Sequence, residues 1–140
     1  MDEDTQLFNS DLDSFQALKD ARLIAQRYGR NILVELGADW CVWCHRLEKF
    51  IASHTELYLL RQQNYVHVRV YSGDGETLSE ICRHLPSFDG IPHYFVFSPD
   101  GQLLHSQDTD SLEDGESYDY DKVWEFLSLW GYNGNRGVLQ

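Results

Sequence analysis

The stretch Ile32-Leu33-Val34-Glu35-Leu36-Gly37-Ala38-Asp39-Trp40-Cys41-Val42-Trp43-Cys44-His45 decides the fold and the chemistry expected of this chain. Its apolar first half is typical of a buried strand, and the two cysteines stand three residues apart at the expected start of a helix. A helix N-terminus carries unpaired N–H groups and the positive end of the macrodipole, so a thiol placed there ionises more easily. Cys44 follows Cys41 by about one helical turn, close enough to form a disulfide. The stretch therefore predicts a redox-active dithiol.

Composition and charge limit the class of protein. The chain has 140 residues, 42% of them hydrophobic, which suits one domain with its own core. A net charge of -12 argues against nucleic acid or anionic lipid as partners, and fits solubility or basic substrate proteins. No apolar run approaches the roughly 18 residues of a spanning helix, so we expect no stable membrane insertion. Residues 1–20 have neither the basic start nor the apolar run of an export signal. Two locations stay open: we expect a periplasmic protein if a signal peptide was removed, and a cytoplasmic one if Met1 is the native start.

Hydrophobic periodicity predicts the remaining elements of an α/β domain. In chain order these are a helix from Asp11 or Asp13 to Gly29, strand 31–37, a helix from the cysteine pair to about residue 62, strand 65–71, a short helix over 78–85, strands 93–98 and 102–106, and a last helix that Gly131 stops. The order is α-β-α-β-α-β-β-α, and Pro99-Asp100-Gly101 is a strong turn signal between the two late strands. We expect a flexible segment over 1–10, one domain over 11–133 and a tail over 134–140.

This order, with Trp40-Cys41-x-x-Cys44 after a long strand and Gly90-Ile91-Pro92 before the hairpin, resembles the thioredoxin fold. Residues 32–44 match the pattern of that family without a gap. Within them, the run from Ala38 to Cys44 also resembles the C-terminal domain of the transmembrane thiol-disulfide interchange proteins. The segments 92–97 and 104–109 are similar to a bacterial thioredoxin-like group that is often exported. The resemblance implies a thioredoxin fold, with a central mixed β-sheet flanked by helices, and we expect a monomer.

The resemblance also implies roles for the two thiols and one acid. Cys41 would be the exposed attacking thiol, and Cys44 the buried thiol that resolves the mixed disulfide. Glu35 falls where thioredoxins carry a buried acid behind the resolving cysteine. Burial would raise its pKa and make it a suitable proton acceptor for Cys44, although an edge position facing water is the alternative.

A substrate-binding surface is implied beside the thiols. Pro92 would be a cis proline, which lets the backbone of Ile91 pair with an extended substrate peptide. Trp40 would shield the site, and Trp43 is either a substrate contact or a lid over the pair. The chemistry needs no cofactor and no metal. The implied partners are disulfide-containing proteins and an upstream thiol reductant or electron-donor protein.

The sequence departs from the thioredoxin pattern at several positions. Gly37 stands where thioredoxins usually have a second tryptophan, and Lys49 stands in place of a proline that kinks the helix. Val42-Trp43 replaces Gly-Pro between the cysteines, and an acidic loop replaces the Val-Gly of the substrate groove. The redox potential and the choice of substrate therefore do not transfer from the family.

Other functions fit parts of the same motif. Cys41-x-x-Cys44-His45 is the attachment pattern of c-type haem with His45 as axial ligand, although such motifs usually lie in helical domains. A zinc site would draw on Cys41, Cys44 and His45 with Cys82 or His84. A peptide-binding adaptor would use the proline edge without turnover. Within redox chemistry, a disulfide oxidase or isomerase is the alternative to a reductase.

Three further features have two interpretations each. His45 is either an imidazolium that stabilises the Cys41 thiolate or a histidine on the helix surface. Cys82 lies on the apolar stripe of its helix and is expected to be a small core residue, with a regulatory thiol as the alternative. The acidic residues 108–116 suggest calcium, but Leu112 occupies a ligand place of the EF-hand pattern, so we expect a solvated loop.

Overall fold

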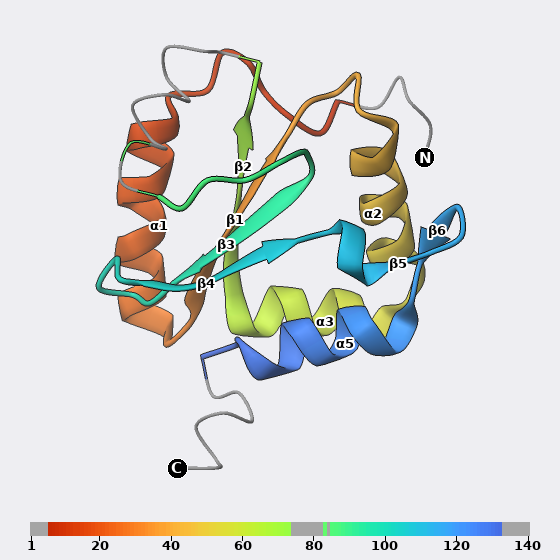
Figure 1. Cartoon of the computed structure of the whole chain (residues 1–140). Coiled ribbons are helices and arrows are strands. Elements are labelled where there is room, and N and C mark those ends of the chain that lie inside the picture. Colours follow the sequence, from red (N-terminus) through yellow and green to blue (C-terminus); the bar gives the residue numbers. More distant parts are fainter. Residues whose placement is uncertain (1–5, 74–82, 84, 133–140) are drawn as a thin grey trace.

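A four-stranded mixed sheet forms the centre of the computed structural model, which describes residues 6–73, 83 and 85–132 (Figure 1). The elements in chain order are α1 (Ser14–Tyr28), β1 (Asn31–Gly37), α2 (Val42–Ser53), α3 (Thr55–Asn64), β2 (Tyr65–Tyr71), β3 (His93–Phe97), β4 (Leu103–Asp108), the short 3-10 helix η1 (Asp110–Leu112), β5 (Glu113–Asp114), β6 (Ser117–Tyr118) and α5 (Tyr120–Leu129). The predicted thioredoxin-type arrangement, a mixed sheet flanked by helices, is confirmed. The helix predicted over 78–85, which includes Cys82, lies outside the described residues.

The order of strands in the sheet is β2-β1-β3-β4, and β1 is a central strand. It pairs in parallel with β2 and antiparallel with β3, and β3 pairs antiparallel with β4. In this register Glu35 lies opposite Arg69 on one side and opposite Tyr94 on the other. Directly paired residues share a face of the sheet, so these three side chains meet on one face.

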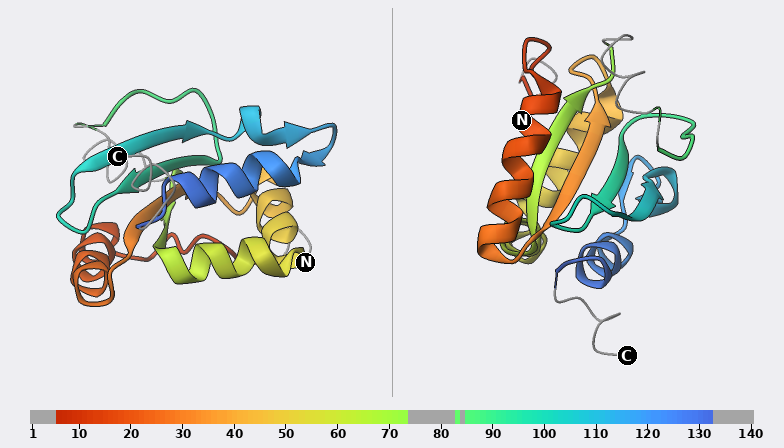
Figure 2. Two further views of the ribbon diagram at one scale, coloured as in Figure 1. Left: turned by 90° about the horizontal axis from the view of Figure 1, so that it is seen from below. Right: turned by 90° about the vertical axis from the view of Figure 1, so that its left-hand side faces the viewer.

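Helices cover both faces of the sheet, as Figure 2 shows. Helix α1 packs on one face, while α2, α3 and α5 lie on the other. Successive residues of β1 alternate between the two layers, since side chains of a strand point to opposite faces. Ile32 and Val34 belong to the core under α1, whereas Leu33 belongs to the core under the three other helices. All seven residues of β1 are buried, as the apolar run predicted.

The ends of α1 confirm the signals expected from the sequence. The carboxylate of Asp13 accepts a hydrogen bond from the Gln16 N–H and caps the first turn. Gly29 ends the helix with φ 67°, a left-handed conformation that glycine adopts without steric cost. Strands β1 and β2 begin and end at the predicted residues, and Gly101 takes the turn between β3 and β4.

The single helix predicted up to about residue 62 is wrong, because the chain leaves the helix at His54. This residue has extended backbone angles, φ -115° and ψ 104°, and separates α2 from α3. The break allows Arg61 of α3 to reach Glu48 of α2, with 2.8 Å between Nη1 and Oε1. In one continuous helix, residues 13 apart would be about 20 Å apart along the axis.

The acidic segment after β4 is more ordered than the predicted solvated loop. It contains η1 and the β5–β6 hairpin, and three of its side chains are buried, those of Thr109, Leu112 and Tyr118. Leu112 and Tyr118 both join the core under α2 and α5, and their burial favours the folded-back path of the segment. Across the described ranges, no helix is both long and apolar enough to span a membrane.

Candidate active site

The two cysteines of the motif lie at the start of α2, next to the end of β1. Cys41 is the N-cap residue, and its Sγ accepts a hydrogen bond from the Cys44 N–H at 3.2 Å. Cys44 lies in the first turn and is fully buried. Neither cysteine is in a disulfide in this structure. The two cysteines therefore lie at a helix N-terminus, as the sequence predicted.

The surroundings shift the pKa values of the two thiols in opposite directions. The hydrogen bond from the Cys44 thiol lowers the pKa of Cys41 from 9.0 to about 7, helped by backbone N–H groups of Cys44 and Trp43 and by the charge of His45. The same shared proton raises the pKa of Cys44, together with burial and the negative charge of Glu35. Near neutral pH, Cys41 is therefore partly ionised, whereas Cys44 keeps its proton.

Cys41 is less accessible than expected. Only 7% of it is exposed, so the prediction of an exposed attacking thiol is wrong for this state. Trp43, Tyr71 and Ile91 are among the side chains that pack around the pair. Trp40, the predicted shield, is 71% exposed and does not belong to the apolar cluster around the thiols.

Residues 7 and 8 are part of the site, although the sequence predicted a flexible segment there. The backbone N–H groups of Leu7 and Phe8 donate to Asp39 Oδ1 at 2.6 and 2.9 Å. Phe8 is 1% exposed and packs on both cysteines. A Cβ on Gly37 would lie 2.4 Å from the Phe8 ring and 2.8 Å from Cys44 Sγ. Phe8 therefore fills the space that the glycine leaves over the buried thiol.

Glu35 is buried as predicted, but its pKa is lowered, whereas burial was expected to raise it. Its Oε1 accepts a hydrogen bond from His67 Nε2 at 2.7 Å and lies 3.6 Å from Arg69 Nε. Burial alone would raise the pKa, yet the hydrogen bond from His67 and the positive charges of Arg69 and Arg61 lower it below 4.5. The prediction of a raised pKa is wrong because it did not include these partners. Glu35 is ionised in the folded protein.

A second carboxylate continues the charged network inside the protein. Glu48 accepts two hydrogen bonds from Arg61, at 2.8 and 3.3 Å, and a further one from Arg69 Nη2. Arg61 is 4% exposed, so the pair is buried on both sides. Sequence reasoning assigned no role to these residues. The available signal was Arg69 within the largely β-branched and aromatic strand 65–71, since the helices that carry Glu48 and Arg61 contain several other charged residues.

The proline segment lies against the nucleophile. The Ile91–Pro92 peptide bond is cis, and Cys41 Sγ lies 3.8 Å from the Ile91 carbonyl oxygen. The hydroxyl of Thr109 donates to the Pro92 carbonyl oxygen at 2.7 Å and fixes the segment to the acidic loop. A cavity of about 340 Å³ lies beside this proline, with His93 and Asp108 among its lining residues.

His45 is buried, so the alternative of a surface histidine is wrong. Its Nε2 donates to the Asp39 carbonyl oxygen at 2.7 Å, because a carbonyl only accepts. The other ring nitrogen, Nδ1, is buried and has no hydrogen-bond partner among the described residues. Among the described residues, no group of three or more His, Cys, Asp or Glu is placed to hold a metal ion, and the zinc candidates Cys82 and His84 lie outside them.

Comparison with known proteins decides the family. A family model described as "Thioredoxin-like" matches residues 13–99. The chain belongs to the thioredoxin-like family. No curated protein sequence matches it significantly. Family membership and the close Cys41–Cys44 pair support thiol-disulfide oxidoreductase activity in general.

Solved structures share the thioredoxin-like fold at low sequence identity. The disulphide isomerase from Xylella fastidiosa Temecula1 aligns with a TM-score of 0.72 and 19% identity, over 88% of this chain and 95% of that chain. The DsbD c-terminal domain of Neisseria meningitidis in its oxidised form gives a TM-score of 0.54 at 16% identity, over 73% of this chain and 85% of that chain. The reduced form of the same domain gives a TM-score of 0.51 at 20% identity, over 66% of this chain and 82% of that chain.

Proposed function

We propose that this thioredoxin-like protein reduces or exchanges disulfides in other proteins through the Cys41–Cys44 couple. The observation that carries the proposal is that the pKa values of the two thiols shift in opposite directions. Cys41 lies at a helix N-terminus and is partly ionised to the thiolate near neutral pH, and Cys44 is a buried, protonated thiol within hydrogen-bonding reach. Cys41 can therefore attack a substrate disulfide first, and Cys44 can resolve the mixed disulfide afterwards.

The reaction has two exchange steps. In the first, the Cys41 thiolate attacks one sulfur of a substrate disulfide, forms a mixed disulfide and releases the other substrate sulfur as a thiolate. In the second, Cys44 loses its proton and attacks Cys41 Sγ, which forms the Cys41–Cys44 disulfide and releases the first substrate sulfur. The substrate disulfide gains two electrons and the protein dithiol loses two. An upstream thiol reductant or electron-donor protein then restores the dithiol.

The proline segment is the proposed binding edge for the substrate peptide. The Ile91 carbonyl oxygen faces Cys41 Sγ, so a peptide paired with this segment would present its disulfide to the nucleophile. Trp40 and Trp43 flank the thiols, and the exposed Trp40 ring offers an apolar contact to a substrate. Because Cys41 is 7% exposed, we expect substrate binding to displace side chains that pack around it.

Disulfide isomerisation is the second candidate function. It is favoured by the lowered pKa of Cys41, because a thiolate that leaves easily can release the substrate before Cys44 resolves it. The name of the similar Xylella protein, a disulphide isomerase, agrees with this candidate. Reduction and isomerisation share the first step and differ in the fate of the mixed disulfide.

The equilibrium redox potential of the Cys41–Cys44 couple tests the proposal. It is measured against glutathione by Trp fluorescence, with Cys82→Ser as the parent so that no third thiol takes part. A potential near about -270 mV would indicate a reductant, and one near about -120 mV an oxidant or isomerase. In the Cys44→Ser variant a mixed disulfide with substrate should accumulate. Absence of any reversible two-electron couple would refute the oxidoreductase function.

A further inference from the structure

We propose that His67 is a positioning residue for resolution of the mixed disulfide: it holds one oxygen of Glu35 and leaves the other free to take the proton of Cys44. The inference rests on the proposed function and adds a residue to it. Glu35 Oε1 is bonded to His67 Nε2 at 2.7 Å. Glu35 Oε2 is buried and has no hydrogen-bond partner among the described residues. An ionised carboxylate with one free buried oxygen can accept a proton there.

The free oxygen belongs to a side chain on the same face of β1 as the buried thiol. Glu35 and Gly37 are two residues apart in the strand, so their side-chain positions lie on one face, about 7 Å apart. Cys44 Sγ lies 2.8 Å from the position of a Cβ on Gly37. The negative charge of Glu35 already acts on Cys44 and contributes to its raised pKa. Once Cys41 is in a mixed disulfide, Glu35 is therefore the nearby anion that can receive the proton.

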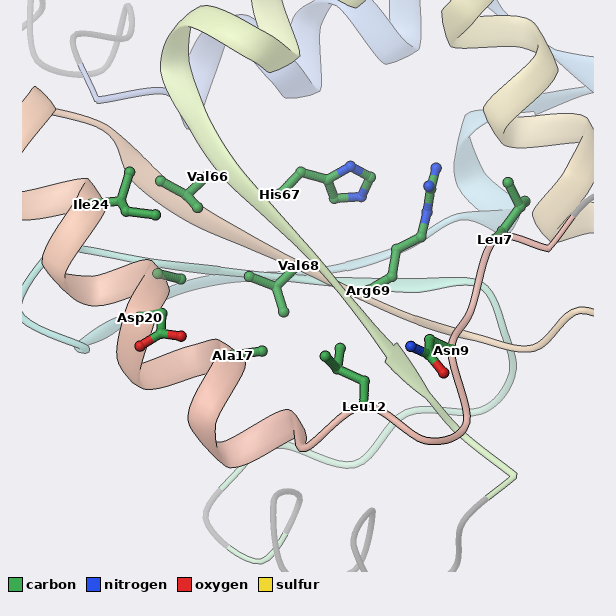
Figure 3. Close-up of a pocket in the computed structure, with 11 residues that line it drawn as sticks. Leu7, Asn9, Leu12, Ala17, Asp20, Ile24, Val66, His67, Val68 and Arg69 are labelled. Carbon is green, nitrogen blue, oxygen red and sulfur yellow. The ribbon is translucent and has the colours of Figure 1, made fainter.

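His67 is placed between Glu35 and solvent. Figure 3 shows His67 and Arg69 projecting to the same side of β2, while Val66 and Val68 project toward α1. His67 and Arg69 are among the residues that line a groove of about 400 Å³ between α1 and this edge strand. The His67 side chain is 13% exposed, whereas that of Glu35 is 1% exposed. A proton on Glu35 therefore has a polar neighbour that reaches solvent.

Other groups around Glu35 do not replace the hydrogen bond from His67. The titratable or charged side chains that act on it are Arg69 of β2, Arg61 of α3, Tyr94 of β3, Tyr118 of β6 and Cys44 of α2. Arg69 and Arg61 are both engaged with Glu48, and Arg69 Nε lies 3.6 Å from Glu35 Oε1, beyond a good hydrogen bond. Burial keeps the phenols of Tyr94 and Tyr118 protonated by raising their pKa.

The reaction with 5,5'-dithiobis(2-nitrobenzoate) isolates the resolution step. In the Cys82→Ser parent, attack by Cys41 releases one nitrothiobenzoate, and attack by Cys44 on the mixed disulfide releases the second. Stopped-flow absorbance between pH 4 and 9 gives the rate of the second release. Loss of the His67 hydrogen bond raises the pKa of buried Glu35, so His67→Leu should move the acid limb of this rate up by about one pH unit. His67→Gln keeps a donor N–H and should restore the parent profile.

Matched controls separate the outcomes. His105→Leu removes a histidine from β4, at the opposite edge of the sheet, and should leave the profile unchanged. An unshifted His67→Leu profile, or a His67→Gln profile shifted as far as that of His67→Leu, would overturn the role of His67. If His67→Leu does not fold, nitrogen-15 spectra of the parent decide: the Nε2–H tautomer supports the inference and the Nδ1–H tautomer overturns it. A parent without a second release refutes the proposed function itself.

Discussion

The contact between Phe8 and Gly37 offers a quantitative test of how the buried thiol is covered. Phe8 is 1% exposed, and its ring occupies the position where a Cβ on Gly37 would lie, 2.4 Å from Cζ. Truncation of a core phenylalanine to alanine costs about 3–5 kcal/mol. We expect Phe8→Ala to cost about 3 kcal/mol, the lower end of that range, because the segment that carries it can shift toward the vacated space.

A double-mutant cycle isolates the contact. In the wild-type protein Gly37→Ala must displace the Phe8 ring, and such overpacking costs about 1–3 kcal/mol. In the Phe8→Ala background that obstacle is gone, although Cys44 Sγ at 2.8 Å still opposes the new methyl group. Gly37→Ala should therefore cost at least about 1 kcal/mol less in that background, which is within the coupling range of contacting residues.

Urea unfolding of the four reduced proteins, followed by Trp fluorescence, measures the coupling free energy. Alkylation of Cys44 by iodoacetamide, measured by mass spectrometry in a Cys41→Ser background, should also become faster in Phe8→Ala. The exposed apolar residue Leu23 supplies the control, since Leu23→Ala should change stability by no more than about 0.5 kcal/mol. Additive costs of Phe8→Ala and Gly37→Ala within about 0.5 kcal/mol, with unchanged alkylation of Cys44, would refute the packing argument.

The hydrogen bonds and pKa shifts lead to three more predictions. Iodoacetamide should alkylate Cys41 with a half-maximal rate near pH 7, and Cys44→Ala should move this midpoint upward; an unchanged midpoint would contradict the shared proton. Asp39→Ala should lower the unfolding free energy by about 1.5–3 kcal/mol and Asp39→Asn by less, measured in urea, since only the amide keeps an acceptor. Stability should fall as pH drops from 7.5 to 5, because burial lowers the pKa of His67 and His93 and the unfolded chain binds the extra protons; a flat urea midpoint would contradict this.

The strands and the first helix were predictable because their signals are local. The apolar run of β1 and the β-branched run of β2 are contiguous in the sequence, and Asp13 and Gly29 mark the ends of α1. The break at His54 was not predictable in the same way. No proline or glycine stands there, and the break is stabilised by the ion pair of Arg61 with Glu48, which is a tertiary contact. Tertiary contacts of this kind override the local helical pattern.

The dithiol was predictable from the sequence, but its surroundings were not. Cys41 and Cys44 are neighbours in the chain, so their placement results from one strand and one helix. The partner of Glu35, His67, is 32 residues away, and its hydrogen bond contributes to a pKa shift opposite to the one predicted from burial alone. The glycine at position 37 was the one signal that another side chain must cover Cys44, although only the fold identifies Phe8 as that side chain.

The buried charges explain why the two thiols act in a fixed order in the proposed reaction. An ionised Glu35 beneath Cys44 opposes a second negative charge there, while the helix N-terminus favours the charge on Cys41. Attack by Cys44 becomes favourable only after Cys41 has lost its negative charge in the mixed disulfide, because the shared proton is then no longer held between the two sulfurs. The ion pair with Arg69 and the positive charge of Arg61, which is itself paired with Glu48, favour this buried negative charge of Glu35. The network around Glu35 therefore links the stability of the protein to the order of its two exchange steps.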